Sequence, residues 1–564
     1  MFSITAAPAA PASRAGARRL AGARARVDAW MVAAALGVAA LACFVVWMGP
    51  TTVAAAPWDI FVLLDGGWRM LQGQTPSTDF YSPTGPLIYW LIEQGMRIVG
   101  PSFRAGMVAS LIFLAAIAPL AIFVFFRKFA SPLAFLLTIA FAVLAVATRP
   151  LGYEPEHMSY LMPYNRMGWI VFAILCAHLF MGDRAPAKPR AGAAALFSGA
   201  LVALLFLDKI TFALGGLAAL AFALVLRPQL RAKAWLAIVG FAAVCALAWT
   251  AFGFDIPAYL SDLGIAAAAQ TYDNRIECLK RVIKFNALQG AVLTAAWVAL
   301  IAWPVRRGWL AFADAARTTL AVGFVFGMSL LISIFNTTEL TDIPHYLAAA
   351  MLVDTWLRRG TAGRRRTRLS YAAAIGVLIA LFTAFPRDLI GFANTYAAMP
   401  YRNGAAPESQ RFASRTYGDL VILHTTKKEA AYSRAHRTPD QINDGLALLR
   451  AHLSPDSRLV SLTLGNPFSL ALELPPARGA PLWLDIDTNF TRESLPPPER
   501  IFGDADFVIH PRPELTGCCM ETVHVLLELN GPYLERRFLE VGRSRDWILL
   551  KRRPDAGAAV LQPH

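Results

Sequence analysis

Three carboxylates stand in one short stretch that follows the first long apolar run of the chain: Asp59, Asp65 and Asp79. The stretch reads DIFVLLDGGWRMLQGQTPSTDFYSPTGPLIYW, and its glycines and prolines indicate a structured loop. A carboxylate held at a membrane–water boundary can take a proton from an acceptor hydroxyl, so each of the three is a candidate catalytic base. The alternative is that such acids solvate a loop or cap a helix, as Asp59 would before Ile60–Met70.

A second polar segment, RPLGYEPEHMSYLMPYNR, runs from Arg149 to Arg166. The guanidinium at each end could bind phosphate oxygens. Between them lie side chains that could ligate a divalent cation such as Mg²⁺ or Mn²⁺, namely Glu154, Glu156 and His157. Two acids and one histidine at this spacing are not specific for metal, so the sequence leaves open both a metal site and a loop without metal.

Ionisable residues also stand at the ends of apolar runs. Asp208 and Lys209 separate two such runs with almost no loop, and charged groups at that depth are costly enough to be functional candidates. Lys209 could hold a donor phosphate as a point charge, or it could form an internal pair with Asp208. His345 and Tyr346 open a later run and are candidate substrate-binding residues, whereas a lone histidine there is more often hydrogen-bonded at a helix end.

The composition is that of a polytopic membrane protein. The 564 residues are 56% hydrophobic and 16% charged, with a mean hydropathy of +0.46. An ordinary soluble protein carries more charge and less apolar sequence. The formal net charge of +15 comes from basic clusters beside apolar runs, which orientation in a bilayer explains better than nucleic-acid binding does. We therefore expect membrane lipids as partners, and no nucleic acid.

Apolar runs long enough to cross a bilayer recur through the first two thirds of the chain. They fall at 30–49, 103–126, 131–148, 167–182, 192–207, 211–226, 234–253, 287–304, 318–335, 343–357 and 370–388. Leu87–Val99 is instead predicted to be an amphipathic helix along the membrane surface. The predicted fold class is mostly α, a polytopic transmembrane helical bundle of about eleven spans in residues 30–391. Residues 1–29 are predicted to be a disordered basic arm in the cytoplasm, because Lys and Arg favour that side.

After residue 391 the apolar runs shorten, and residues 392–564 suffice for one soluble domain. Helical spacing predicts helices at Gln441–Leu453 and Glu521–Asn530. Short buried runs predict strands at Ser457–Leu464, Asp506–His510 and Trp547–Lys551. Alternating helices and strands indicate an α/β domain, and the orientation of the spans places it on the periplasmic side.

The order of these motifs resembles that of the glycosyltransferase-C (GT-C) superfamily, and most closely the bacterial group similar to protein O-mannosyltransferases and aminoarabinose transferases. The resemblance rests on the acid after the first span, the GQTPSTDFYSPTGPLIYWL segment, FLDK at Phe206–Lys209 and IPHYL before a late span. It covers residues 30–390 approximately. Ile60 stands where the family often has Glu, which leaves Asp65 as an alternative base, while the spacing to later residues of the segment favours Asp59.

The resemblance implies an inverting transfer from a polyprenyl-phosphate-linked sugar, on the outer face of the bacterial inner membrane, to an envelope glycan, lipid or protein acceptor. Asp59 would be the general base, and Lys209, Arg149 and Arg166 would meet the charge that develops on the leaving phosphate. Two other classes stay open, a transporter or flippase of lipid-linked saccharide and a non-catalytic scaffold that binds envelope polymer. The sequence has no clear internal repeat of the kind that transporters often carry.

The basic loops supply a test of the topology. A single cysteine that replaces Ala362, in an arginine-rich loop, should be cytoplasmic, and one that replaces Asn443 should be external. In intact cells with the native cysteines removed, a membrane-impermeant thiol reagent should label Asn443→Cys and spare Ala362→Cys. The reverse labelling would invert the topology and remove the outward-facing site.

Overall fold

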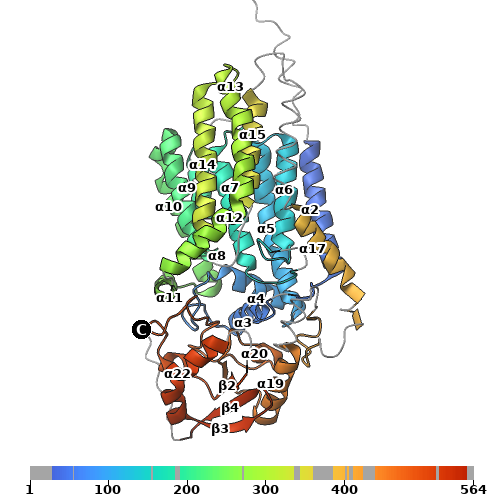
Figure 1. Cartoon of the computed structure of the whole chain (residues 1–564), viewed down its shortest axis with the longest axis vertical. Coiled ribbons are helices and arrows are strands. Elements are labelled where there is room, and N and C mark those ends of the chain that lie inside the picture. Colours follow the sequence, from blue (N-terminus) through green and yellow to red (C-terminus); the bar gives the residue numbers. More distant parts are fainter. Residues whose placement is uncertain are drawn as a thin grey trace, which may run out of the picture.

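The computed structural model describes residues 28–54, 56–153, 157–184, 191–269, 272–335, 343–359, 385–400, 403–404, 411–422, 438–515 and 520–554. Within them the chain forms a bundle of long helices with a small α/β domain at one end (Figure 1). Two shorter helices, α3 (Asp59–Leu71) and α4 (Leu87–Val99), lie between these parts (Figure 1). The predicted fold class, a mostly helical membrane bundle with a C-terminal α/β domain, is confirmed.

The long helices of the bundle follow the predicted apolar runs. They are α2 (Ala29–Met48), α5 (Arg104–Lys128), α6 (Ser131–Val146), α7 (Pro163–Phe180), α8 (Ala191–Asp208), α9 (Ile210–Leu226), α10 (Trp235–Phe252), α12 (Tyr272–Trp297), α14 (Phe312–Ile334) and α15 (Ile343–Arg359). Each predicted run from 30–49 to 343–357 coincides with one of them, and the last, 370–388, lies largely outside the described residues. Six helices in the described part are long and apolar enough to cross a membrane. Large apolar side chains such as Leu36 and Ile238 are exposed on the bundle, which suits contact with lipid.

One stretch predicted to be an external loop is largely helical. Residues 254–286 form α11 (Ile256–Ala268) and the first half of α12, which begins at Tyr272 and not near residue 287. Cys278, Val282 and Asn286 are buried at a four-residue spacing, while the charged residues between them are exposed. The helix therefore extends beyond the apolar run, because one face packs and the other is solvated.

The remaining elements of the membrane part are short: η1 (Pro228–Lys233), η2 (Val298–Ala302), α13 (Trp303–Arg306) and α17 (Phe385–Ala397). Both η2 and α13 continue α12 toward the end of the bundle that lies away from the α/β domain (Figure 1). The predicted domain boundary at residue 391 falls inside α17.

The layer between the bundle and the domain depends on close packing of α3 against α4. A Cβ atom on Gly66 would lie 2.3 Å from the Tyr89 ring, and one on Gly67 would lie 2.4 Å from Ile92. The two helices can approach this closely only because both positions lack a side chain. The bounds of α4 are those of the amphipathic helix predicted from the sequence, and its inner face is buried.

The C-terminal domain is built on one small sheet. Its elements are α19 (Thr438–His452), β1 (Leu459–Ser461), α20 (Phe468–Ala471), α21 (Pro498–Phe502), β2 (Phe507–Pro511), α22 (Met520–Arg537), β3 (Phe538–Arg543) and β4 (Trp547–Arg552). The sheet has the order β1-β2-β4-β3, with β1 parallel to β2 and the other pairs antiparallel. Every predicted helix and strand of this domain coincides with an observed one, whereas β3 was not predicted.

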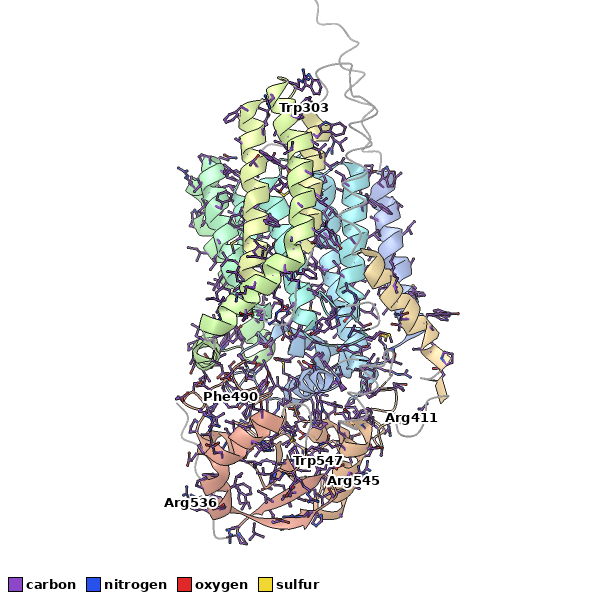
Figure 2. All side chains as sticks on the ribbon, viewed as in Figure 1. Trp303, Arg411, Phe490, Arg536, Arg545 and Trp547 are labelled. Carbon is purple, nitrogen blue, oxygen red and sulfur yellow. The ribbon has the colours of Figure 1, made fainter. Side chains whose placement is uncertain are left out.

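Trp547 fixes α19 against the sheet. Its ring is fully buried and lies edge-on to Phe468 of α20, with ring centroids 5.0 Å apart. The indole Nε1 donates to Gln441 O at 2.7 Å, so the buried polar atom of this large side chain is satisfied. Figure 2 shows Trp547 inside the domain.

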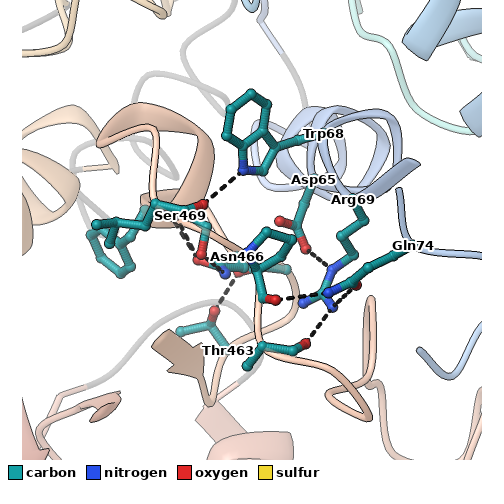
Figure 3. A network of polar contacts seen from close by, with 12 residues as sticks. Asp65, Trp68, Arg69, Gln74, Thr463, Asn466 and Ser469 are labelled. Carbon is teal, nitrogen blue, oxygen red and sulfur yellow. Dashed lines mark hydrogen bonds and ion pairs between the residues drawn. The ribbon is translucent and has the colours of Figure 1, made fainter. Parts of the chain in front are cut away.

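A set of side-chain donors joins α3 to the C-terminal domain. The indole of Trp68, the guanidinium of Arg69 and the amide of Gln74 donate at 3.0, 2.9 and 2.7 Å to backbone carbonyls of residues 474–477 (Figure 3). Arg69 also forms an ion pair with Asp65, with 2.8 Å between Nε and Oδ2, and both side chains are buried. Charge-assisted bonds at buried positions fix orientation strongly, so α3 and the domain form one unit.

We predict that this junction fails when its cation is removed. Arg69→Met should leave the buried Asp65 carboxylate without its counter-charge, at a cost of about 3–5 kcal/mol. Asp65→Asn in the same chain should restore part of that loss. The measurement is the apparent melting temperature of purified protein in detergent. Arg478→Met is the control, because its pair with Asp79 is exposed and contributes little. Equal melting temperatures for Arg69→Met and wild type would contradict the assignment.

Candidate active site

Lys209 stands at a break between two helices. It is the N-cap residue of α9, with extended backbone (φ −164°, ψ 135°), and α8 ends at the residue before it. The Lys209 Nζ donates to Asn165 Oδ1 at 3.2 Å and lies 5.2 Å from the centre of the Tyr164 ring. Both contact residues belong to the first turn of α7. The N-termini of α7 and α9 therefore meet around one ammonium group.

Arg166 and Arg149 extend this arrangement. Arg166 also lies in the first turn of α7, is buried, and donates from Nη1 to Arg149 O at 2.9 Å. The guanidinium of Arg149 donates in turn to Tyr153 O at 2.6 Å, inside its own loop. Arg166 is thus joined to the backbone of Arg149, and Asn165, the residue before Arg166, contacts Lys209. We call Lys209, Arg149 and Arg166 the cation cluster.

The turn that leads into α7 is strained. Met162 has φ 43° and ψ 52°, a left-handed conformation that is uncommon for a residue with a long side chain. Pro163 follows as the first helical residue, where its fixed φ and missing N–H cost nothing. Strain of this kind persists where the surrounding structure needs the backbone in that position. Here it sets the direction of the helix end that carries Asn165 and Arg166.

Asp208, the residue before Lys209, makes no hydrogen bond to it. Asp208 is buried at the end of α8, and neither carboxylate oxygen has a hydrogen-bond partner in the described part of the chain. Gly168 of α7 packs against this carboxylate, since a Cβ atom there would lie 2.6 Å from Asp208 Oδ2. The internal Asp208–Lys209 pair considered from the sequence does not form. Cations and two helix N-termini together favour an anion at this point.

The loop between α3 and α4 contacts the break between α8 and α9. Gly85 N donates to Asp208 O at 3.2 Å, and a Cβ atom on Gly85 would lie 2.2 Å from Leu207 O. Only glycine permits this approach. The loop between α3 and α4 is therefore held beside Lys209 by backbone contacts.

Asp59 lies in the same layer. It is partly buried in the first turn of α3, and Trp58, not Asp59, is the N-cap residue. The chain just before α3 runs along the second polar segment, where Ala54 N donates to Met158 O at 2.7 Å and Thr51 N donates to the Tyr160 hydroxyl at 3.1 Å. The start of α3 and the segment that contains Arg149 and Arg166 are thereby joined.

The other two acids of the first loop are engaged by arginines. Burial raises the pKa of Asp65, the paired Arg69 guanidinium opposes that rise, and the pair holds the domain junction. Asp79 accepts from Thr75 N at 2.8 Å and forms an ion pair with Arg478 at 2.9 Å. Both carboxylates therefore have structural partners, Asp65 at the domain junction and Asp79 within the first loop and at Arg478.

Two further groups were predicted from the sequence, the His345–Tyr346 pair and the candidate ligands of a divalent cation. His345 and Tyr346 are buried at the start of α15, where the His345 ring lies edge-on to Phe326 of α14 with centroids 5.4 Å apart. His157 packs its ring against Tyr153. Its proposed partners Glu154 and Glu156 lie outside the described residues, so the divalent-cation site stays a prediction.

The sequence did not single out Asp262 or Arg500, which join α11 to the layer. Asp262 is fully buried, accepts from Ser82 N at 2.8 Å and pairs with Arg500 at 3.4 Å. Burial raises the pKa of Asp262 to about 6, and the bond from Ser82 and the Arg500 charge oppose that rise. Asn165 and Tyr164 were missed too, because only the start of α7 gives them a place beside Lys209.

Comparison with solved structures returned two structures of ArnT from Cupriavidus metallidurans. The apo structure aligns over 98% of this chain and 100% of its own, at 14% identity and a TM-score of 0.45. The structure bound to undecaprenyl phosphate aligns over 92% of this chain and 98% of its own, at 13% identity and a TM-score of 0.47. No family model matches the sequence, and no curated protein matches it.

A third solved structure is that of the archaeal oligosaccharyltransferase AglB from Archaeoglobus fulgidus, in complex with an inhibitory peptide and a dolichol-phosphate. It aligns over 91% of this chain and 72% of its own, at 10% identity and a TM-score of 0.32. ArnT and AglB both belong to the GT-C superfamily, which the sequence motifs resemble. All three TM-scores are below 0.5.

Proposed function

We propose that the protein is an integral membrane glycosyltransferase that moves a sugar from a polyprenyl-monophosphate donor to an acceptor hydroxyl. The observation that carries the proposal is the position of Lys209, whose ammonium contacts Asn165 between the N-termini of α7 and α9. Such a site suits a phosphate, because helix N-termini and fixed cations both favour an anion.

The reaction needs two kinds of group. The acceptor oxygen forms a bond to the anomeric carbon while the bond from that carbon to the phosphate oxygen breaks, with inversion. Asp59 takes the proton of the acceptor hydroxyl as general base. Lys209 and Arg166 meet the charge that develops on the departing polyprenyl phosphate. Because all these groups lie in one layer fixed by backbone contacts, little reorganisation is needed during the reaction.

The membrane supplies the donor at the right level. The bundle helices have apolar outer faces on which a polyprenyl tail can lie, so the phosphate would reach the layer at the helix ends. The positive-inside rule assigns that layer and the C-terminal domain to the periplasmic side of the inner membrane. The acceptor is then an envelope glycan, lipid or protein.

The direct test uses purified protein in detergent with polyprenyl-phosphate sugars and a panel of envelope acceptors. A transferase releases polyprenyl phosphate only when both substrates are present, and the acceptor gains the mass of one sugar. A flippase would release no polyprenyl phosphate, yet it would move the lipid-linked sugar across liposomes. A scaffold would do neither.

The general base supplies one prediction. Asp59→Asn keeps the size of the side chain but removes the proton acceptor, so turnover should fall by about a hundredfold to ten-thousandfold. The helix should survive, since a first-turn carboxylate contributes only about 0.3–1 kcal/mol. Asp255→Asn is the matched control, because Asp255 caps α11 in the same layer and asparagine caps equally well. Full transfer activity of Asp59→Asn would move the base to another residue.

The phosphate contact supplies a second prediction. Lys209→Met removes the charge but keeps most of the side-chain volume, so donor use should fall by at least about tenfold. The concentration of donor needed for half-maximal rate should rise, and the maximal rate should fall. Lys280→Met is the control, since Lys280 is an exposed lysine on α12. Normal kinetics of a well-folded Lys209→Met protein would exclude a phosphate role for Lys209.

A further inference from the structure

A second basic cavity lies at the end of the bundle opposite to the C-terminal domain. Its volume is about 90 Å³, and it is bounded by the ends of α7, α9 and α15 and the start of α14. Three arginines line it, Arg227, Arg317 and Arg358, together with the carboxylate of Asp314. Trp303 of α13 marks the same end of the bundle in Figure 2.

Arg227 and Arg317 have no hydrogen bond or ion pair to their guanidinium groups within the described residues. Arg227 directly follows α9 and is partly buried, and Arg317 lies in the second turn of α14. Burial lowers the pKa of the Arg227 guanidinium, and the positive charge of Arg317 lowers it further. Two like charges therefore face one cavity, which is unfavourable unless an anion lies between them.

The carboxylates nearby are engaged by other cations. Asp183 attracts Arg227 only at longer range, because its oxygens pair with Lys128 at 2.7 Å and Arg127 at 3.3 Å. Asp354 of α15 pairs with Arg184 at 3.0 Å and with Arg358. Asp314 remains as the acid of the cavity wall, against Arg227 and Arg317, because Arg358 is paired with Asp354. The cavity thus keeps a positive excess.

The other walls fit a phosphate group with an organic substituent. The hydroxyls of Thr318 and Thr355 hydrogen-bond to each other at 3.1 Å on one wall, and whichever accepts in that bond can donate its own proton to a phosphate oxygen. Phe180, Met181 and Ala321 provide an apolar wall. Guanidinium groups bind phosphate through paired N–H donors, and a basic pocket at the ends of transmembrane helices matches the level of lipid headgroups.

We propose that this cavity binds a phosphate group, from an anionic phospholipid headgroup or from free phosphate, between Arg227 and Arg317. The site is separate from the cation cluster, which lies at the other end of the bundle, and it does not depend on the proposed transfer reaction. Its occupation would relieve the repulsion between the two guanidinium groups and would link α9 to α14.

The test measures binding to delipidated wild-type protein by native mass spectrometry and by the shift in melting temperature. The probes are phosphatidylglycerol, phosphatidylcholine and inorganic phosphate. Phosphatidylglycerol should bind and raise the melting temperature, whereas zwitterionic phosphatidylcholine should bind at least about tenfold more weakly. If phosphatidylglycerol binds and inorganic phosphate neither binds nor competes, the cavity is a lipid site. If inorganic phosphate competes with phosphatidylglycerol, the cavity recognises the phosphate group alone.

Arg227→Gln/Arg317→Gln is the decisive variant. It should lose at least about tenfold in affinity for the phosphate-bearing probe. Without lipid it should melt at the same temperature as wild type or higher, because the mutual repulsion is gone. Lys233→Gln/Arg306→Gln is the matched control. It removes two positive charges from the same end of the bundle, outside the cavity, and should bind phosphatidylglycerol like wild type. The proposal is overturned if the cavity variant binds like wild type, if it melts lower without lipid, or if the control loses binding equally.

Discussion

The contact of a lysine ammonium at a helix break with the amide of a second helix is the interaction around which this structure is organised. Lys209 Nζ donates to Asn165 Oδ1, and this contact brings together the N-termini of α7 and α9. The neighbouring acid, Asp208, is buried, and its carboxylate has no hydrogen-bond partner in the described part of the chain. A cation in that position is costly near a membrane and is retained where it serves binding. Gly85 supports it by holding the first loop on the break.

The rigidity of the surrounding layer comes from the C-terminal domain. The donors of α3, above all Arg69, reach backbone carbonyls of that domain, and the buried pair with Asp65 fixes their geometry (Figure 3). Arg500 and Asp262 make a similar connection to α11. A general base and an anion site work only if their positions are held to a fraction of an ångström. We infer that the domain acts as a clamp on the first loop, a role that its position beneath α3 and α4 allows.

The sequence predicted the parts of the fold that depend on hydrophobicity alone. Apolar runs marked the bundle helices, and helical spacing and short buried runs marked two helices and three strands of the C-terminal domain. It missed β3, whose mostly exposed residues follow α22 without a break, and it placed the start of α12 too late because the first turns are amphipathic. The candidate site divides in the same way. Lys209 and Arg166 stand out by charge in an apolar context, whereas Asn165 and the Asp262–Arg500 pair are recognisable only from contacts between distant segments.

The most direct test of the anion site is hydrogen–deuterium exchange on purified protein with and without a polyprenyl monophosphate. The corresponding polyprenol, which has the same tail but no phosphate, is the reference ligand. The account predicts that the phosphate compound slows exchange at the start of α7 (residues 163–168) and around the α8–α9 break (residues 207–213), and that the alcohol does not. Equal protection by both compounds, or protection confined to the opposite end of the bundle, would contradict a phosphate site at Lys209.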